Sequence, residues 1–369
     1  MQKTKIHELS ELGQSVWLDF IQRSLIQSGD LQDYVEQGLT GVTSNPALFG
    51  KAIESGNEYD EQMGELAQHG RPAQDIYDEL TIEDARTAAD VLRPVFDKTG
   101  GRDGFFSLEV SPHLAHEKWD TVYEAHRLFG TVGKPNVMIK VPATESGYQS
   151  IQVLTEDGLN INITLIFSLG QYERVVESYI SGLEKRLANG YGVSHVSSVA
   201  SFFVSRVDTL VDKLLDQHAE PSAKSLKGKI GLANARMAYQ RFKELFGSER
   251  WSHLAEKGAQ VQRVLFGSTG TKNPDYSDVM YIDNLIGPAT INTIPPETLE
   301  AFLDHGNVAL TLEEDLDESR AQLEQLKELG IDLEEVGSQL LEDGIGKFIK
   351  PYDSVLDTIM ERSAELVSH

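Results

Sequence analysis

The stretch NINITLIFSLGQYERVVESYISGLEKRLANG, residues 160–190, contains the pattern on which the fold prediction rests. Its first eight residues are mostly apolar and β-branched, which is typical of a buried strand. Ser168 then stands where a helix N-cap is expected. From residue 169 onward, apolar side chains recur at three- and four-residue spacing, which predicts a helix. A strand followed directly by a helix is the repeating unit of parallel α/β folds.

The same unit recurs along the whole chain. Helical patterns separate eight strand-like runs, which lie at 15–20, 41–45, 104–110, 136–143, 160–167, 198–205, 263–269 and 289–294. Eight strand–helix units predict an α/β protein and, by their number, a closed (β/α)8 TIM barrel. An open, doubly wound sheet is the alternative fold. No G-x-G-x-x-G motif follows the first run, which counts against it.

We expect one domain, spanning residues 1–369. The barrel would occupy about residues 1–295, and an extension of helices would occupy about residues 296–369. The extension has amphipathic spacing at 316–330 and 354–367, with no strand pattern between them. We therefore expect its helices to pack on the barrel.

Composition excludes several classes of protein. The 369 residues carry 33 basic and 58 acidic side chains, a formal charge of −25, which opposes binding to nucleic acid or anionic membranes. No apolar stretch is long enough to span a bilayer, and the first residues lack a signal-peptide core. The absence of cysteine excludes thiol catalysis and disulfides and suits a cytoplasmic protein. An anionic substrate would need local arginine or lysine side chains.

Alternate residues of a strand share one face, and in most runs one of the two faces is apolar. The apolar face, expected to pack against the helices, comprises Val16, Leu18, Phe106, Leu108, Val110, Ile139, Val141, Ile161, Ile163 and Leu165. The opposite face, expected to point into the lumen, carries Asp19, Thr43, Asn45, Glu109, Lys140, Asn162, Thr164, Ser201 and Phe203. Active sites of such barrels lie at the C-terminal mouth of the lumen. One such polar group is ordinarily structural, but a convergent set is costly to desolvate and indicates function.

Lys140 is the most informative of these residues, because it interrupts the apolar run NVMIKVPA at 136–143. Burial disfavours the charged form of a lysine. A neutral amine attacks carbonyl carbons and forms a Schiff base, which can act as the electron sink when a carbon–carbon bond breaks or forms. The alternative is an architectural lysine that is ion-paired with Glu109 or Asp19.

Four segments resemble the signature segments of transaldolase, in the order that this family has them: SNPALF (44–49), NVMIKVPAT (136–144), INITLIFS (161–168) and SVASFFVSRVD (198–208). The resemblance extends from VWLDF at 16–20 to the helical tail. It implies transfer of a dihydroxyacetone unit from sedoheptulose 7-phosphate to glyceraldehyde 3-phosphate, giving erythrose 4-phosphate and fructose 6-phosphate, in the pentose phosphate pathway. It also implies sugar-phosphate substrates and no metal, nucleotide or organic cofactor.

The resemblance also implies roles for individual residues. Lys140 would form the Schiff base, and Asp19 would be the general base and acid at the C4 hydroxyl. Glu109 and Thr164, with Thr43 nearby, would hold the water that exchanges protons during imine formation and hydrolysis. The residues that would bind substrate are Asn45 and Asn162 at the dihydroxyacetone hydroxyls, Ser201 and Phe203 beside the cleaved bond, and Arg206 and Ser268 at the phosphate.

The sequence departs from the family pattern at two points. Many transaldolases have a second arginine after the seventh strand, where this chain reads FGSTGTKN and offers Lys272 instead. The second departure follows Glu109, where the chain reads VSPHLAH and the family more usually has aspartate–proline–arginine. Here Ser111 and Pro112 predict the N-cap and first residue of a helix, and its two histidines are not expected to bind metal.

Other functions remain as alternatives. Fructose-6-phosphate aldolase, a smaller relative that releases free dihydroxyacetone, has a tyrosine at the position of Phe203, so the phenylalanine and the long chain favour transaldolase. A barrel that has lost catalysis and serves as a scaffold would have lost Lys140, Asp19 or Glu109. A metal-dependent hydrolase would need histidines at strand ends, and the seven clearer runs have none there. The oligomer is left open between monomer and homodimer.

Overall fold

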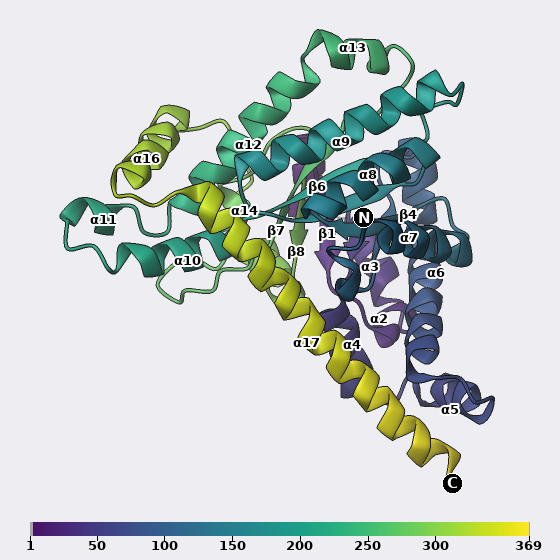
Figure 1. Cartoon of the computed structure of the whole chain (residues 1–369). Coiled ribbons are helices and arrows are strands. Elements are labelled where there is room, and N and C mark those ends of the chain that lie inside the picture. Colours follow the sequence, from purple (N-terminus) through teal and green to yellow (C-terminus); the bar gives the residue numbers. More distant parts are fainter. Residues whose placement is uncertain (1–2, 369) are drawn as a thin grey trace.

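A computed structural model of the protein describes residues 3–368. Eight parallel strands close into a barrel in the order β1-β2-β3-β4-β5-β6-β7-β8, so the predicted TIM barrel is confirmed (Figure 1). The strands are β1 Gln14–Asp19, β2 Gly41–Thr43, β3 Phe105–Glu109, β4 Val137–Pro142, β5 Ile161–Ile166, β6 Ser198–Phe203, β7 Arg263–Gly267 and β8 Thr290–Ile294.

Helices surround this barrel and continue beyond its last strand (Figure 1). In the first half of the chain they are α1 Lys5–Glu11, α2 Arg23–Gln27, α3 Asp30–Glu36, α4 Pro46–Ser55, α5 Asp60–Gln68, α6 Ala73–Thr99, the 3-10 helix η1 Pro112–Leu114, α7 Lys118–Val132, α8 Glu145–Asp157 and α9 Leu169–Ala188. In the second half they are α10 Ser205–Leu215, α11 Pro221–Ser225, α12 Ile230–Phe246, α13 Glu249–Ala255, α14 Met280–Asp283, α15 Pro296–His305, α16 Leu316–Glu328 and α17 Leu333–Val367.

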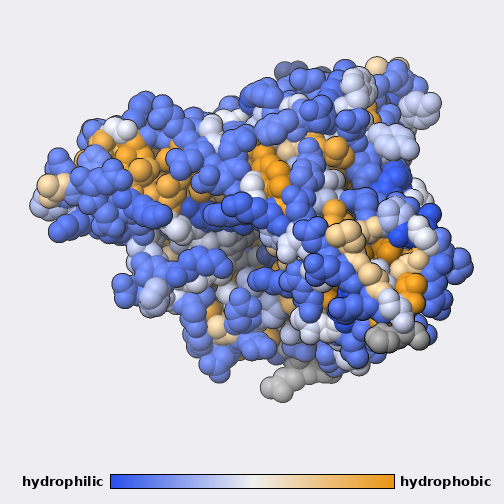
Figure 2. Space-filling model, turned by 60° about the horizontal axis from the view of Figure 1, so that its bottom comes forward, coloured by the Kyte–Doolittle hydropathy of each residue, from blue (hydrophilic) through white to orange (hydrophobic). Residues whose placement is uncertain are grey.

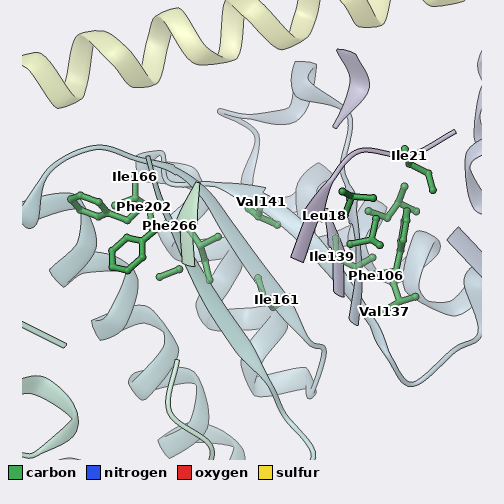
Figure 3. Packing of buried hydrophobic residues seen from close by; sticks show 14 of the residues in the cluster. Leu18, Ile21, Phe106, Val137, Ile139, Val141, Ile161, Ile166, Phe202 and Phe266 are labelled. Atoms are coloured by element: carbon green, nitrogen blue, oxygen red, sulfur yellow. The ribbon is translucent and has the colours of Figure 1, made fainter. Parts of the chain in front are cut away.

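The two strand faces are packed differently, as the alternation predicts. Side chains such as Leu18, Phe106, Ile139 and Ile161 lie in the main hydrophobic core, between strands and helices (Figure 3). The lumen has a separate apolar cluster, formed by Trp17, Phe105, Met138, Val199, Leu265 and Ile291. This cluster separates a buried polar network of Ser15, Asp103 and Arg263 at the N-terminal end of the lumen from the polar residues at its C-terminal mouth.

Strand β5 breaks the alternation near its end. Its register with β6 is irregular between Ile163 and Ile166, and Leu165 has a φ of 61°. Leu165 packs with Phe203 and Phe348 in a second cluster, while Ile166 takes the position facing the main core. The prediction that Leu165 shares the face of Ile161 and Ile163 is therefore wrong, because the irregularity shifts the alternation by one residue.

The predicted helix start at Ser111 and Pro112 is confirmed in position but not in the type of helix. Pro112 does open a helical turn, but this turn is the 3-10 helix η1, and the Ser111 side chain makes no capping hydrogen bond. The Ala115 amide donates to the Pro112 carbonyl and closes the turn. The longer helix α7 begins only at Lys118.

The last helix, α17, is the largest feature that the sequence pattern did not delimit. It includes the predicted stretch 354–367 but starts 21 residues earlier, at Leu333, and passes through Pro351 without a break. It runs diagonally past the barrel (Figure 1) and contacts β5, α9 and α10 on one side and α4, α5 and α6 on the other. The last helix therefore touches the C-terminal part of β5, near the mouth of the barrel.

The face of the molecule shown in Figure 2 is mainly hydrophilic, and the hydrophobic side chains on it lie in separate areas. This distribution agrees with the large excess of acidic residues. Within residues 3–368, no helix combines the length and the hydropathy that a membrane crossing requires.

Candidate active site

A cavity of about 160 Å³ lies at the C-terminal mouth of the barrel. Among the residues predicted for the site, those that line it are Asp19, Thr43, Asn45, Lys140, Ser201, Phe203, Arg206, Ser268 and Lys272. Its other walls are Gly267, Gly270, Thr293, Pro295 and Phe348. The structure thus brings residues from six strand ends, the start of α10, the loop after β7 and the last helix to one small space.

Lys140 lies on β4, and only 4% of it is exposed. Its Nζ is 3.1 Å from Glu109 Oε2, as an ion pair rather than an aligned hydrogen bond. The same amine donates a hydrogen bond of 3.1 Å to the Ser44 carbonyl, and the Phe348 ring centroid is 5.8 Å away. The lysine is therefore held by neighbours and still reaches the cavity, as a nucleophile must.

Asp19 is at the end of β1, next to Thr43 on β2. The Thr43 hydroxyl donates to Asp19 Oδ1 at 2.9 Å and lies 2.7 Å from the Thr293 hydroxyl. Burial raises the pKa of Asp19, while the nearby charge of Lys140 and the Thr43 hydrogen bond lower it. A carboxyl group whose pKa is moved toward neutrality can both take up and release a proton during turnover.

Glu109 and Thr164 lie behind the cavity wall rather than on it. Glu109 is the register partner of Lys140 on the neighbouring strand, and burial raises its pKa against the lowering effect of Lys140. The buried Thr164 hydroxyl has no hydrogen-bond partner among residues 3–368. Thr164 itself pairs with Pro142, two residues after the lysine. Both groups have unused hydrogen-bonding capacity close to Lys140.

The two predicted asparagines differ in their surroundings. Asn45 lines the cavity, and its Oδ1 accepts from the Leu48 amide at 3.0 Å, so it also caps helix α4. Asn162 is fully buried and does not line the cavity. Its Nδ2 donates to Ser107 Oγ at 3.0 Å, and its Oδ1 accepts from Ser201 Oγ at 2.6 Å. Asn162 therefore holds Ser201 in place directly, while any contact with substrate would need its remaining N–H.

Arg206, the second residue of α10, supplies the local positive charge that an anionic substrate would need in this acidic protein. Its Nη1 is buried and has no hydrogen-bond partner among the described residues. The guanidinium lies 5.2 Å from the Phe203 ring centroid and 5.9 Å from that of Phe348, and burial lowers its pKa. A partly buried guanidinium that lines a cavity, with a buried N–H group left unpaired, is suited to bind an anion.

Ser268 and Lys272 line the same cavity from the loop after β7. Ser268 has a φ of 53°, and its hydroxyl is 3.0 Å from that of Ser205, the first residue of α10. Farther along this loop, Tyr276 donates to Asp212 of α10 at 2.7 Å. The loop that carries Lys272 is thereby tied to the helix that carries Arg206.

Sequence reasoning missed three residues of this site: Ser44, Thr293 and Phe348. Thr293 lies in the eighth strand-like run, so strict alternation from Ile291 would have placed it on the lumen face. Ser44 contributes a backbone carbonyl, which no side-chain pattern indicates. Phe348 comes from α17, far along the chain, and nothing in its local sequence points to the barrel mouth.

The histidines after β3 lie against the last helix. His113 Nε2 is 2.7 Å from Asp353 Oδ1, and His116 Nε2 is 3.5 Å from Glu342 Oε2. In the described part of the chain, no three histidine, aspartate or glutamate side chains lie close enough together to hold a metal ion.

Comparison with known proteins identifies the family. The model of the Transaldolase/Fructose-6-phosphate aldolase family matches residues 16–359. Transaldolase 2 of Nostoc punctiforme is 44% identical over 374 aligned positions, which cover 98% of each chain. The transaldolase of Thermobifida fusca is 43% identical and covers 97% of this chain and 98% of its own, and that of Trichodesmium erythraeum is 40% identical with 97% of each chain covered. The resemblance seen in the sequence is confirmed. The chain belongs to the transaldolase/fructose-6-phosphate aldolase family.

Proposed function

We propose that this protein is a transaldolase, which transfers a dihydroxyacetone unit from sedoheptulose 7-phosphate to glyceraldehyde 3-phosphate and so gives erythrose 4-phosphate and fructose 6-phosphate. One observation carries the proposal. The amine of Lys140 and the unpartnered guanidinium of Arg206 face the same cavity of about 160 Å³. Such a pair suits a small molecule with a carbonyl at one end and a phosphate at the other.

In this mechanism the amine of Lys140 adds to the C2 carbonyl of the ketose phosphate, and loss of water gives a protonated imine. Asp19 takes the proton of the C4 hydroxyl, the bond between C3 and C4 breaks, and its electron pair moves into the imine to form an enamine. The aldehyde phosphate leaves. The enamine then attacks the acceptor aldehyde, Asp19 returns its proton to the new hydroxyl, and water hydrolyses the imine to free Lys140.

Proton exchange at the imine is assigned to Glu109 and Thr164. Glu109 already contacts the lysine amine, and the free hydroxyl of Thr164 supports a role in holding the water that enters and leaves. Burial keeps Asp19 and Glu109 at raised pKa values, which brings both carboxyl groups closer to the range in which general acid–base catalysis is efficient.

The substrate phosphate is assigned to Arg206, Ser268 and Lys272, which line one side of the cavity. Arginine can bind a phosphate through two parallel hydrogen bonds. Lysine supplies a single point charge, which compensates for the second arginine that many relatives have.

The cytoplasmic location and the choice between monomer and homodimer stay predictions.

The alternative is release of free dihydroxyacetone, the reaction of fructose-6-phosphate aldolase. It would require efficient hydrolysis of the three-carbon imine instead of transfer. Phe203 lies at the cavity, with its ring 5.4 Å from that of Phe167. It has no hydroxyl that could orient water, unlike the tyrosine of the aldolase, so transfer is the favoured reaction.

Borohydride trapping tests the proposal. The protein is incubated with fructose 6-phosphate, reduced, digested and mapped by mass spectrometry. We expect a three-carbon adduct on Lys140, and no adduct in Lys140→Ala. Added erythrose 4-phosphate should accelerate donor consumption many-fold. If the folded protein formed no adduct, the Schiff-base mechanism would be contradicted. If fructose 6-phosphate were consumed at the same rate with and without erythrose 4-phosphate, the aldolase reaction would be favoured.

A further inference from the structure

The helix α17 contributes one residue to the cavity, Phe348, which lies near both groups on which the proposed function depends. Only 5% of this residue is exposed. Its ring centroid is 5.8 Å from Lys140 Nζ and 5.9 Å from the Arg206 guanidinium carbon. The ring therefore lies close both to the amine that would form the imine and to the guanidinium assigned to the phosphate.

The path of α17 is built to bring this ring close to the strands. A Cβ atom at Gly344, one turn before Phe348, would lie 2.8 Å from Leu165 Cδ2. At that distance a larger side chain would require Leu165 to shift, so the glycine allows the close approach. Leu165 itself reaches α17 because of the irregularity in β5. The close approach of helix and strand therefore depends on both the irregular strand position and Gly344.

Hydrogen bonds fix α17 before Phe348. Near its start, Glu334 accepts from Ser168 Oγ at 2.7 Å and from the Gly170 amide at 2.9 Å, at the beginning of α9.

The helix is fixed after Phe348 as well. Tyr352 donates to Gln74 at 2.7 Å, and Arg362 donates to the carbonyls of Ile53 and Gly56 at 2.9 and 2.6 Å. Figure 1 shows the resulting long diagonal course of the helix. Because α17 is held on both sides of Phe348, its ring is fixed in the wall of the site.

We propose that Phe348 is a specificity-determining residue: its ring keeps water from the three-carbon enamine on Lys140 and so favours transfer to an aldehyde over release of dihydroxyacetone. This inference rests on the proposed transaldolase function. Release begins when the enamine carbon gains a proton from water. A second water then adds to C2, the bond between C2 and the lysine nitrogen breaks, and dihydroxyacetone leaves. Transfer instead uses the enamine electron pair to form a carbon–carbon bond with the acceptor.

The ring is placed to separate these two outcomes. After the aldehyde phosphate departs, the side of the cavity near Arg206 is free, and solvent could enter from there toward the enamine. Phe348 lines this part of the cavity with an apolar ring close to Arg206. The face of this ring is attractive to cations, which makes it compatible with both the protonated imine and the guanidinium that it borders.

The test compares three variants of the full chain. Phe348→Ala removes the ring, Phe348→Leu keeps most of the apolar bulk, and Leu340→Ala removes a buried side chain of the same helix that does not line the cavity. Free dihydroxyacetone from fructose 6-phosphate is followed with glycerol dehydrogenase and NADH. Transfer is followed with erythrose 4-phosphate as acceptor, and the adduct on Lys140 is trapped with borohydride in every case.

In Phe348→Ala we expect the ratio of release to transfer to rise about tenfold, which corresponds to about 1.4 kcal/mol in relative barrier height. In Phe348→Leu and Leu340→Ala we expect that ratio to stay within about twofold of the unmodified protein, because volume-conserving apolar changes are tolerated well and Leu340 is outside the cavity. An unchanged ratio in Phe348→Ala, or an equal rise in Phe348→Leu or Leu340→Ala, would overturn the inference. Absence of the Lys140 adduct in the unmodified protein would instead overturn the proposed function.

Discussion

Replacing Lys140 by methionine should destabilise the fold as well as abolish catalysis. The side chains of Lys140 and Glu109 are 5% and 4% exposed, and their charged atoms are 3.1 Å apart. Removing one partner of a buried ion pair leaves the other charge without compensation, which costs about 3–5 kcal/mol. We therefore expect Lys140→Met to lower the free energy of unfolding by about this amount near neutral pH. Urea unfolding, followed by tryptophan fluorescence, measures it, since Trp17 and Trp251 are both buried in the folded chain.

The loss should depend on pH in a defined direction. Burial raises the pKa of Glu109, and Lys140 opposes that rise, so the pKa of Glu109 goes up further when the lysine is gone. A carboxyl group with a raised pKa binds its proton more tightly in the folded chain than in the unfolded chain. Its stabilising contribution is complete below the unfolded pKa of about 4.3 and is lost as pH rises through the folded pKa. The deficit of Lys140→Met should therefore be larger at alkaline than at acidic pH.

A second substitution isolates the cause. Glu109→Gln in the Lys140→Met background removes the stranded charge, and we expect it to recover at least about 1 kcal/mol and to flatten the pH dependence. Neither variant should form a borohydride adduct. Two results together would refute the reasoning: the same loss of unfolding free energy in Lys140→Met at every pH, and a further loss when Glu109→Gln is added. They would show that the lysine and the glutamate are not energetically coupled.

Two further predictions concern the phosphate site and the last helix. Arg206→Ala should raise KM for fructose 6-phosphate about 10- to 100-fold, since a hydrogen bond to a charged group is worth about 1.5–3 kcal/mol; steady-state kinetics with unphosphorylated fructose is the control, and an equal loss there would argue against phosphate binding. Gly344→Ala and Gly346→Ala gain the same helix propensity, but a Cβ at Gly344 meets a strand side chain at 2.8 Å whereas one at Gly346 has nothing within 4 Å. Thermal unfolding should rank Gly344→Ala below Gly346→Ala by about 1–3 kcal/mol, and equal stabilities would show that α17 does not need its close approach.

Much of the barrel was predictable because strand alternation is a local property. Val16 and Leu18 face the helices, and Trp17 and Asp19 face the lumen, simply because neighbouring side chains point to opposite sides. Eight such runs, each followed by a helix, have few ways to bury their apolar faces other than a closed barrel. Lys140 was identifiable for the same reason, since an amine in a buried run is costly without a task.

The resemblance to the family, rather than any pattern, indicated Arg206, Ser268 and the roles of the carboxylates. Residues in loops and first helical turns follow no period, so spacing carries no information about them. The structure nevertheless brings Arg206 and Ser268 to the same cavity, through the contact between the loop after β7 and the start of α10.

Long-range packing decided the rest. Whether Leu165 continues the alternation depends on the register between β5 and β6 and on the helix above it, and both are set by partners distant in sequence. Phe348 reaches Lys140 across 208 residues of chain because Gly344 permits a close approach and contacts at both ends hold α17 in place. Amphipathic spacing tells which face of α17 is buried, but not which part of the barrel it covers. The strands, their faces and the reactive lysine are thus written in local sequence, while the wall that closes the site arises only when distant segments pack together.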